Sequence, residues 1–173
     1  RFPYRTIELL EMTTMGDEQL DVSLMKIGGK GVFVKELETA LYDGRADLAV
    51  HSLKDVPMEL PNGLDLCCLT TRENPTDAVV HRIGTTAWAG FADIPPGAHL
   101  GTSSLRRIAQ IRALRPDLTL SPVRGNLGTR LKKLDSGEFD GLVLASAGLK
   151  RLELSERIAF ETTPEEILPA CGQ

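Results

Sequence analysis

The 173-residue sequence predicts an α/β fold with mostly parallel sheets. Two observations lead to this prediction. Short apolar runs typical of buried strands alternate with segments of helical periodicity, and glycine and proline residues punctuate the joins between them. Because strands that alternate with helices form βαβ units, the sheet should be largely parallel and covered by helices on both faces.

In the first part of the chain, the pattern predicts three strands and one helix. The strands are expected at residues 6–12, 48–51 and 64–70. The helix is expected at residues 31–42, with Leu37 and Ala40 on its apolar face and Gly44 as its stop. The third strand would place Cys67 and Cys68 in or near the core.

A second α/β unit is predicted after a loop-rich segment at residues 72–96, and a domain boundary is expected near Pro75. The pattern predicts a strand near His99, a helix at 104–114, a strand at 118–123, a helix at 127–134 and a strand at 141–145. Trp88 lies in the loop-rich segment and is expected to serve packing.

Three polar turns at strand ends are candidate functional sites. The first places Ser52, Lys54 and Asp55 after a short apolar strand, and Pro57 ends it. The carboxyl end of a strand in an open α/β sheet is a common place for chemistry. The alternative for this turn alone is a solvated loop, because short motifs match by chance.

The other two turns are rich in arginine. In the first, Ser103 or Ser104 can cap a helix whose first turn contains Arg106 and Arg107. Cations are disfavoured at a helix N-terminus, so their placement predicts a ligand that supplies negative charge. In the second, Arg124 leaves a strand and Arg130 lies one turn into the next helix. A solvated side chain is the alternative for each arginine alone, but four at two neighbouring junctions favour a shared anion site.

Composition narrows the possible functions. The chain has 20 basic and 24 acidic residues, and its net charge of −4 argues against a general nucleic-acid binder. No apolar run approaches the roughly 20 residues of a membrane span. The three cysteines show neither metal-ligand spacing nor a disulfide framework, which favours a reducing compartment.

An ordered series of motifs resembles the hydroxymethylbilane synthase (porphobilinogen deaminase) family. No single tetrapeptide is specific, but the series occurs in family order and covers almost the whole chain. The matching segments are residues 27–38, 46–57, 101–107, 124–131 and 144–149.

The resemblance implies a fold of three domains, of which the first two resemble the lobes of periplasmic binding proteins with the active site in the cleft between them. Residues 1–74 would form domain 1 without its first strand and helix, 75–168 domain 2, and 169–173 a return segment toward domain 1. The third, α+β domain of the family would be absent, so this chain alone is expected to be inactive.

The activity that the resemblance implies is the joining of four porphobilinogen units, with loss of ammonia, in tetrapyrrole (haem and porphyrin) biosynthesis. Asp55 would stabilise the positive charge that develops near ring nitrogens, and Lys54 would keep it ionised. The remaining site residues would bind substrate or cofactor carboxylates, which arginine forks match well. They are Lys30, Lys54, Ser104, Arg106, Arg107, Arg124 and Arg130.

The resemblance also implies a covalent dipyrromethane cofactor, whose attachment cysteine matches none of Cys67, Cys68 and Cys171. No metal is expected. Porphobilinogen would be the partner, without nucleic acid or membrane, and the protein would be a cytoplasmic monomer. Phe33 is either part of a mobile lid or part of a flexible helix entry. His51 is expected to be a satisfied structural residue.

A non-catalytic two-lobed binding module for an anionic small molecule is the alternative function. Asp55 discriminates between the two. A carboxylate in a site for polyanions weakens simple binding, but it stabilises a cation that develops during a reaction. A nucleic-acid-binding function is a distant third, because the arginines lack interleaved aromatic residues and aromatic residues make up only 5% of the chain.

Overall fold

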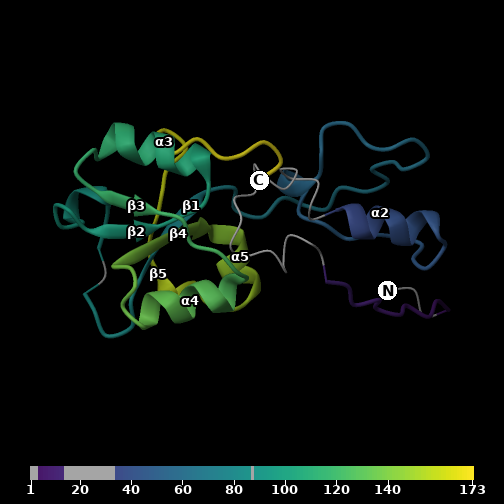
Figure 1. Cartoon of the computed structure of the whole chain (residues 1–173), viewed down its shortest axis with the longest axis horizontal. Coiled ribbons are helices and arrows are strands. Elements are labelled where there is room, and N and C mark those ends of the chain that lie inside the picture. Colours follow the sequence, from purple (N-terminus) through teal and green to yellow (C-terminus); the bar gives the residue numbers. More distant parts are fainter. Residues whose placement is uncertain (1–3, 14–33, 87) are drawn as a thin grey trace. The chain divides into compact units, whose positions relative to one another are not determined.

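The computed structural model describes residues 4–13, 34–86 and 88–173 (Figure 1). The chain divides into two compact units, Arg1–Cys67 and Cys68–Gln173. The division lies shortly before Pro75, where the sequence suggested a boundary. Lys30 and Phe33, two of the proposed site residues, lie outside the described residues.

The described part of the first unit contains helix α2 (Lys35–Tyr42) and the short 3₁₀ helix η2 (Leu53–Asp55). Helix α2 ends where predicted, and Gly44 follows it with φ of +67°. Ala40 is buried on the predicted apolar face.

The three strands predicted for this unit are wrong, because residues 6–12, 48–51 and 64–70 form no regular structure. Their side chains are open to solvent, and Leu9 and Val50 are 90% and 96% exposed. A strand needs a neighbouring strand and a covered face to be stable, and neither is present for these segments among the described residues. Cys67 and Cys68 are exposed for the same reason, so their predicted core position is also wrong.

The second unit is built on a mixed five-stranded sheet with the order β3-β2-β4-β1-β5. The strands are β1 (Asp77–His81), β2 (His99–Gly101), β3 (Thr119–Ser121), β4 (Gly141–Ala145) and β5 (Ile158–Glu161). Strand β2 pairs in parallel with β3 and β4, whereas β1 is antiparallel to both β4 and β5. The sheet is therefore mostly parallel in direction, with β1 as the reversed strand.

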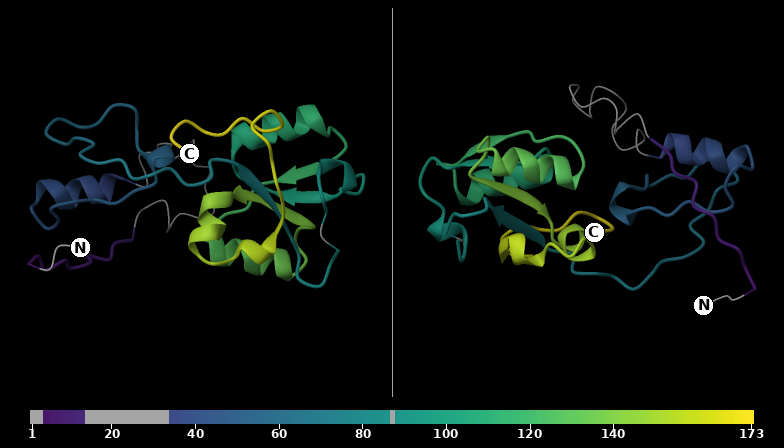
Figure 2. Two further views of the ribbon diagram at one scale, coloured as in Figure 1. Left: turned by 180° about the vertical axis from the view of Figure 1, so that it is seen from behind. Right: turned by 90° about the horizontal axis from the view of Figure 1, so that it is seen from below.

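Helices cover both faces of this sheet, as predicted (Figures 1 and 2). Helix α3 (Leu105–Leu114) packs through Ile111 against one face. Helices α4 (Leu127–Asp135) and α5 (Ser146–Arg151) pack through Leu134 and Leu149 against the other. The strands alternate between the faces, so Val80 joins the α4 side and Val79 the α3 side. Trp88 packs against the α3 side of the core, which confirms its packing role.

Strand β1 was the main element missed by the sequence prediction in this unit. It lies inside the segment predicted to be loop-rich, yet its first four residues are buried. Because Asn74, Pro75 and Gly84 flank so short a run, turn signals outweighed the apolar residues Ala78–Val80 in the sequence pattern.

Candidate functional site

Two polar turns lie side by side at the carboxyl edge of the parallel strands in the second unit. One runs from Thr102 to Ser104, between β2 and α3, and the other from Val123 to Asn126, between β3 and α4. Ser103 Oγ donates a hydrogen bond of 2.7 Å to the carbonyl of Val123. The two turns predicted from the sequence are therefore joined directly.

Each turn starts its helix with a side-chain cap. Ser104 Oγ accepts from the backbone N–H of Arg107 at 3.4 Å, so Ser104 is the cap of α3, one of the two serines predicted for this role. Asn126 Oδ1 accepts from the backbone N–H of Thr129 at 2.9 Å. These contacts satisfy N–H groups that a helix start leaves without an intrahelical partner.

Gly125 gives the turn before α4 its tight geometry. Its φ of +107° lies in the region that favours glycine. A Cβ at this position would lie 2.7 Å from Cγ2 of Thr129. The carbonyl of Gly125 accepts a hydrogen bond of 2.7 Å from Nε of Arg130. The turn therefore holds the Arg130 guanidinium through its Nε atom.

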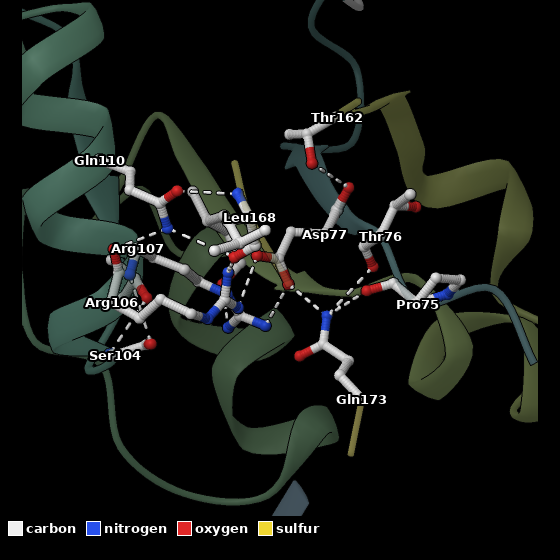
Figure 3. A network of polar contacts seen from close by, with 12 residues as sticks. Pro75, Thr76, Asp77, Ser104, Arg106, Arg107, Gln110, Thr162, Leu168 and Gln173 are labelled. Atoms are coloured by element: carbon white, nitrogen blue, oxygen red, sulfur yellow. Dashed lines mark hydrogen bonds and ion pairs between the residues drawn. The ribbon is translucent and has the colours of Figure 1, made fainter. Parts of the chain in front are cut away.

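Arg106 and Arg107, here called the arginine pair, converge on the carboxylate of Asp77 (Figure 3). Nη2 of Arg106 lies 2.7 Å from Oδ2 of Asp77, and Nη2 of Arg107 lies 2.7 Å from Oδ1. The placement of two arginines at a helix start predicted a negatively charged ligand, whereas the negative charge that lies against them in the structure belongs to the chain itself. Two cations share this single carboxylate.

The two arginines differ in access to solvent. The side chain of Arg107 is 8% exposed and donates a further hydrogen bond of 3.0 Å to the carbonyl of Val143. Its Nε is buried and has no hydrogen-bond partner among the residues that the structure describes. The side chain of Arg106 is 22% exposed and also donates to the carbonyl of Leu168. Arg106 is therefore the more accessible member of the pair.

Residues that the sequence prediction did not single out complete this network. Gln173 Nε2 donates to Oδ1 of Asp77 at 2.9 Å and to the carbonyl of Pro75 at 2.6 Å. Gln110 accepts from the backbone N–H of Leu168 at 2.7 Å. A signal for Asp77 was available, because a carboxylate that directly precedes a buried apolar run needs a partner.

The environment of Asp77 keeps its carboxyl ionised. Burial alone would raise its pKa, but hydrogen bonds and charge from Arg107, with further hydrogen bonds from Gln173 and Arg106, outweigh burial and lower the pKa below the ordinary value. Asp77 is fully buried. An ionised group at such a depth is tolerated only when it is paired and hydrogen-bonded.

Comparison with known proteins identifies the family of the chain. Residues 3–173 match the family model described as "Porphobilinogen deaminase, dipyromethane cofactor binding domain". The chain belongs to the porphobilinogen deaminase family. Proteins named porphobilinogen deaminase from Chromobacterium violaceum and Albidiferax ferrireducens are 59% and 61% identical to it, over 99% and 96% of this chain. These alignments cover 54% and 52% of the two relatives, so the chain spans about half of their length.

In the first unit, two residues singled out for this family lie on η2. Lys54 and Asp55 are half-buried, and the backbone N–H of Asp55 bonds to the carbonyl of Ser52 at 2.9 Å. His51 contacts the same carbonyl through Nδ1 at 3.0 Å, in line with the structural role expected for it. The convergence of Asp55 with the arginines stays a prediction.

Two features typical of other classes of protein are absent from the described part of the chain. No group of three or more histidine, cysteine, aspartate or glutamate side chains there could hold a metal ion. Among the same residues, no helix has the length and apolar character needed to cross a membrane.

Proposed function

We propose that the protein joins porphobilinogen units head to tail into linear hydroxymethylbilane and releases ammonia at each step. Relatives that bear the porphobilinogen deaminase name, more than half identical to nearly all of this chain, support the proposal. The observation that carries it is the arginine pair, which shares one internal carboxylate and so keeps an excess positive charge. Such a cluster suits a substrate that bears carboxylates.

The substrate chemistry explains the number of arginines. Each porphobilinogen unit contains an acetate and a propionate, so a lengthening product accumulates negative charge. Arg106, Arg107, Arg124 and Arg130 are proposed to bind these carboxylates, with Ser104 and Lys30 in support. Arginine suits this role because its planar fork donates two parallel hydrogen bonds to one carboxylate.

Asp55 is the proposed catalytic residue. Loss of ammonia and attack by a pyrrole carbon both develop positive charge near ring nitrogens, which a fixed carboxylate stabilises. Lys54, its neighbour in η2, is proposed to contact substrate. Phe33 is proposed to belong to a lid.

The residues of the second unit fit the dipyrromethane group that the family model names. Its two pyrroles bear carboxylates, and the chain offers cationic donors. They include the buried Nε of Arg107, for which the described part of the chain supplies no hydrogen-bond partner. When bound, this group supplies the primer on which the product chain is extended. Arg106 and Arg107 would hold its carboxylates, and Ser104 would keep the start of α3 in place.

We further propose that the protein acts as a cytoplasmic monomer without a nucleic-acid or membrane partner. The net charge of −4 supports the absence of a nucleic-acid partner.

The experiment uses the full-length protein and follows porphobilinogen consumption together with ammonia release. Wild-type protein should consume porphobilinogen, whereas Asp55→Ala should be slower by roughly 10²-fold or more, the range expected for a lost acid–base or electrostatic group. Asp47→Ala removes an exposed carboxylate of the same unit and should keep wild-type activity. A wild-type protein that binds porphobilinogen without consuming it would instead support the binding-module alternative.

A further inference from the structure

We infer that Asp77 is a positioning residue, which orients the arginine pair so that Arg106 can bind a carboxylate of a ligand. The inference rests on the proposed function in taking that ligand to bear carboxylates. It adds a residue outside the three polar turns and gives different roles to the two arginines.

Asp77 is itself held rigidly. It is the first residue of β1, in the interior of the sheet between β4 and β5. Its carbonyl accepts hydrogen bonds from the backbone N–H and the hydroxyl of Thr162, at 2.8 Å and 3.1 Å. Because the backbone of Asp77 is fixed in this way, its carboxylate is an anchor at a fixed position for the side chains that reach it from α3 (Figure 3).

The two oxygens of this anchor are divided between the arginines. Oδ1 accepts from Arg107 and from Gln173, at 2.7 Å and 2.9 Å, whereas Oδ2 accepts from Arg106 at 2.7 Å. Each guanidinium therefore contacts Asp77 through one Nη atom, while its other Nη atom donates to a backbone carbonyl, that of Leu168 for Arg106 and that of Val143 for Arg107. Arginine has five N–H donors, so this arrangement fixes the plane of each group without using all of its donors.

The remaining donors separate the roles of the two arginines. Arg107 is buried and bonded to Val143, so it is the inner member of the pair and the less accessible one to a carboxylate from solvent. Arg106 keeps 22% of its side chain exposed, so a carboxylate from solvent can reach it. The pair and Asp77 together bring two positive charges and one negative charge, and the site keeps one net positive charge with which to attract that carboxylate.

Replacing Asp77 with a neutral residue distinguishes two effects on carboxylate binding: the orientation of Arg106 and the net charge of the cluster. Asp77→Asn raises the net charge of the cluster by one, so charge alone would strengthen carboxylate binding. Loss of the anchor would instead let the guanidinium of Arg106 rotate, and ordering it again on binding has a cost in free energy. If Asp77 positions the pair, the variant binds carboxylates more weakly in spite of its greater positive charge.

The test uses full-length protein with ¹⁵N-labelled arginine and glutarate, a simple dicarboxylate, as the probe. The Nε–H signal of Arg106 is assigned with Arg106→Lys, and glutarate is titrated into wild type, Asp77→Asn and the control Asp135→Asn. Asp135 forms an ion pair of 2.7 Å with Arg157, a residue distant from it in the sequence. This ion pair is not part of the network around Asp77. We expect a saturable shift in wild type and in the control, and binding weaker by up to about tenfold in Asp77→Asn, the cost of immobilising one more side chain on binding.

Several results would overturn the inference. They are the absence of a saturable shift at Arg106 in wild type, equal or tighter binding by Asp77→Asn, and an equal loss of binding in Asp135→Asn. If Asp77→Asn does not fold, Arg107→Lys keeps the charge but removes the planar fork. It should weaken glutarate binding similarly, and unchanged binding would contradict the role of the anchor. The titration does not depend on turnover, so a wild type inactive on porphobilinogen would refute the proposed function separately.

Discussion

Gln173 Nε2 donates a hydrogen bond of 2.9 Å to Oδ1 of Asp77, although 96 positions separate the two residues in the chain. The same amide reaches the carbonyl of Pro75, at 2.6 Å. The segment that leads into β1 and the segment that ends at Gln173 are thus tied together at the carboxylate that also holds Arg106 and Arg107. Because of this link, protonation or substitution of Asp77 should lower the stability of the second unit.

Stability should fall in acid through Asp77. Its pKa in the folded protein lies below the ordinary value of 3.8, so its contribution is fully present above that value and is lost as pH falls through the folded pKa. Asp77→Asn should lower the free energy of unfolding at neutral pH by about 3–5 kcal/mol, the cost of breaking a buried ion pair. Urea unfolding at a series of pH values measures both proteins, and the difference between them should shrink toward low pH. A difference that does not change with pH would contradict this account.

Gly125→Ala should destabilise the turn before α4. A Cβ would lie 2.7 Å from Cγ2 of Thr129, and φ of +107° disfavours any side chain. The backbone term is about 1–2 kcal/mol, and crowding adds about 1–3 kcal/mol. Gly97→Ala is the matched control, because its φ is +77° but no atom lies within 4 Å of the added Cβ. Thermal unfolding should show the larger loss in Gly125→Ala, and equal losses would show that crowding by Thr129 contributes nothing.

Arg130→Lys should impair extension of the product chain in the full-length protein. The substitution keeps the positive charge but removes the Nε donor to the carbonyl of Gly125 and the planar fork. Porphobilinogen consumption should slow by about tenfold, as expected for one charged hydrogen bond. Mass spectrometry should show enzyme with partly extended chains accumulating. Arg112→Lys alters an exposed arginine of α3 and should behave as wild type, and equal activity of the two variants would remove Arg130 from the site.

Cys67 and Cys68 should react with a thiol reagent in the native protein. Both are exposed, as is Cys171. Alkylation with iodoacetamide without denaturant, followed by peptide mapping, should label all three. If Cys67 and Cys68 react only after the protein is unfolded, that result would support the buried strand that the sequence pattern predicted there.

The sequence pattern was most successful where local signals agreed with one another. The apolar run of β4 (Gly141–Ala145) was predicted with its observed bounds, and helix α3 follows the capping serine as expected. These elements are specified by periodicity and capping, which act within a few residues. The strands predicted in the first unit failed because propensity does not supply a neighbouring strand.

The candidate site shows the same division between local and long-range information. The residue types and order of the sequence determined the polar turns, their serine and asparagine caps and the strained glycine, because each depends on its near neighbours. The sequence also predicted a negatively charged ligand for Arg106 and Arg107, but it did not indicate a carboxylate of the chain itself. Only the tertiary structure decided that Asp77 is a partner, because β1 enters the sheet antiparallel between β4 and β5 and places that carboxylate beside the start of α3.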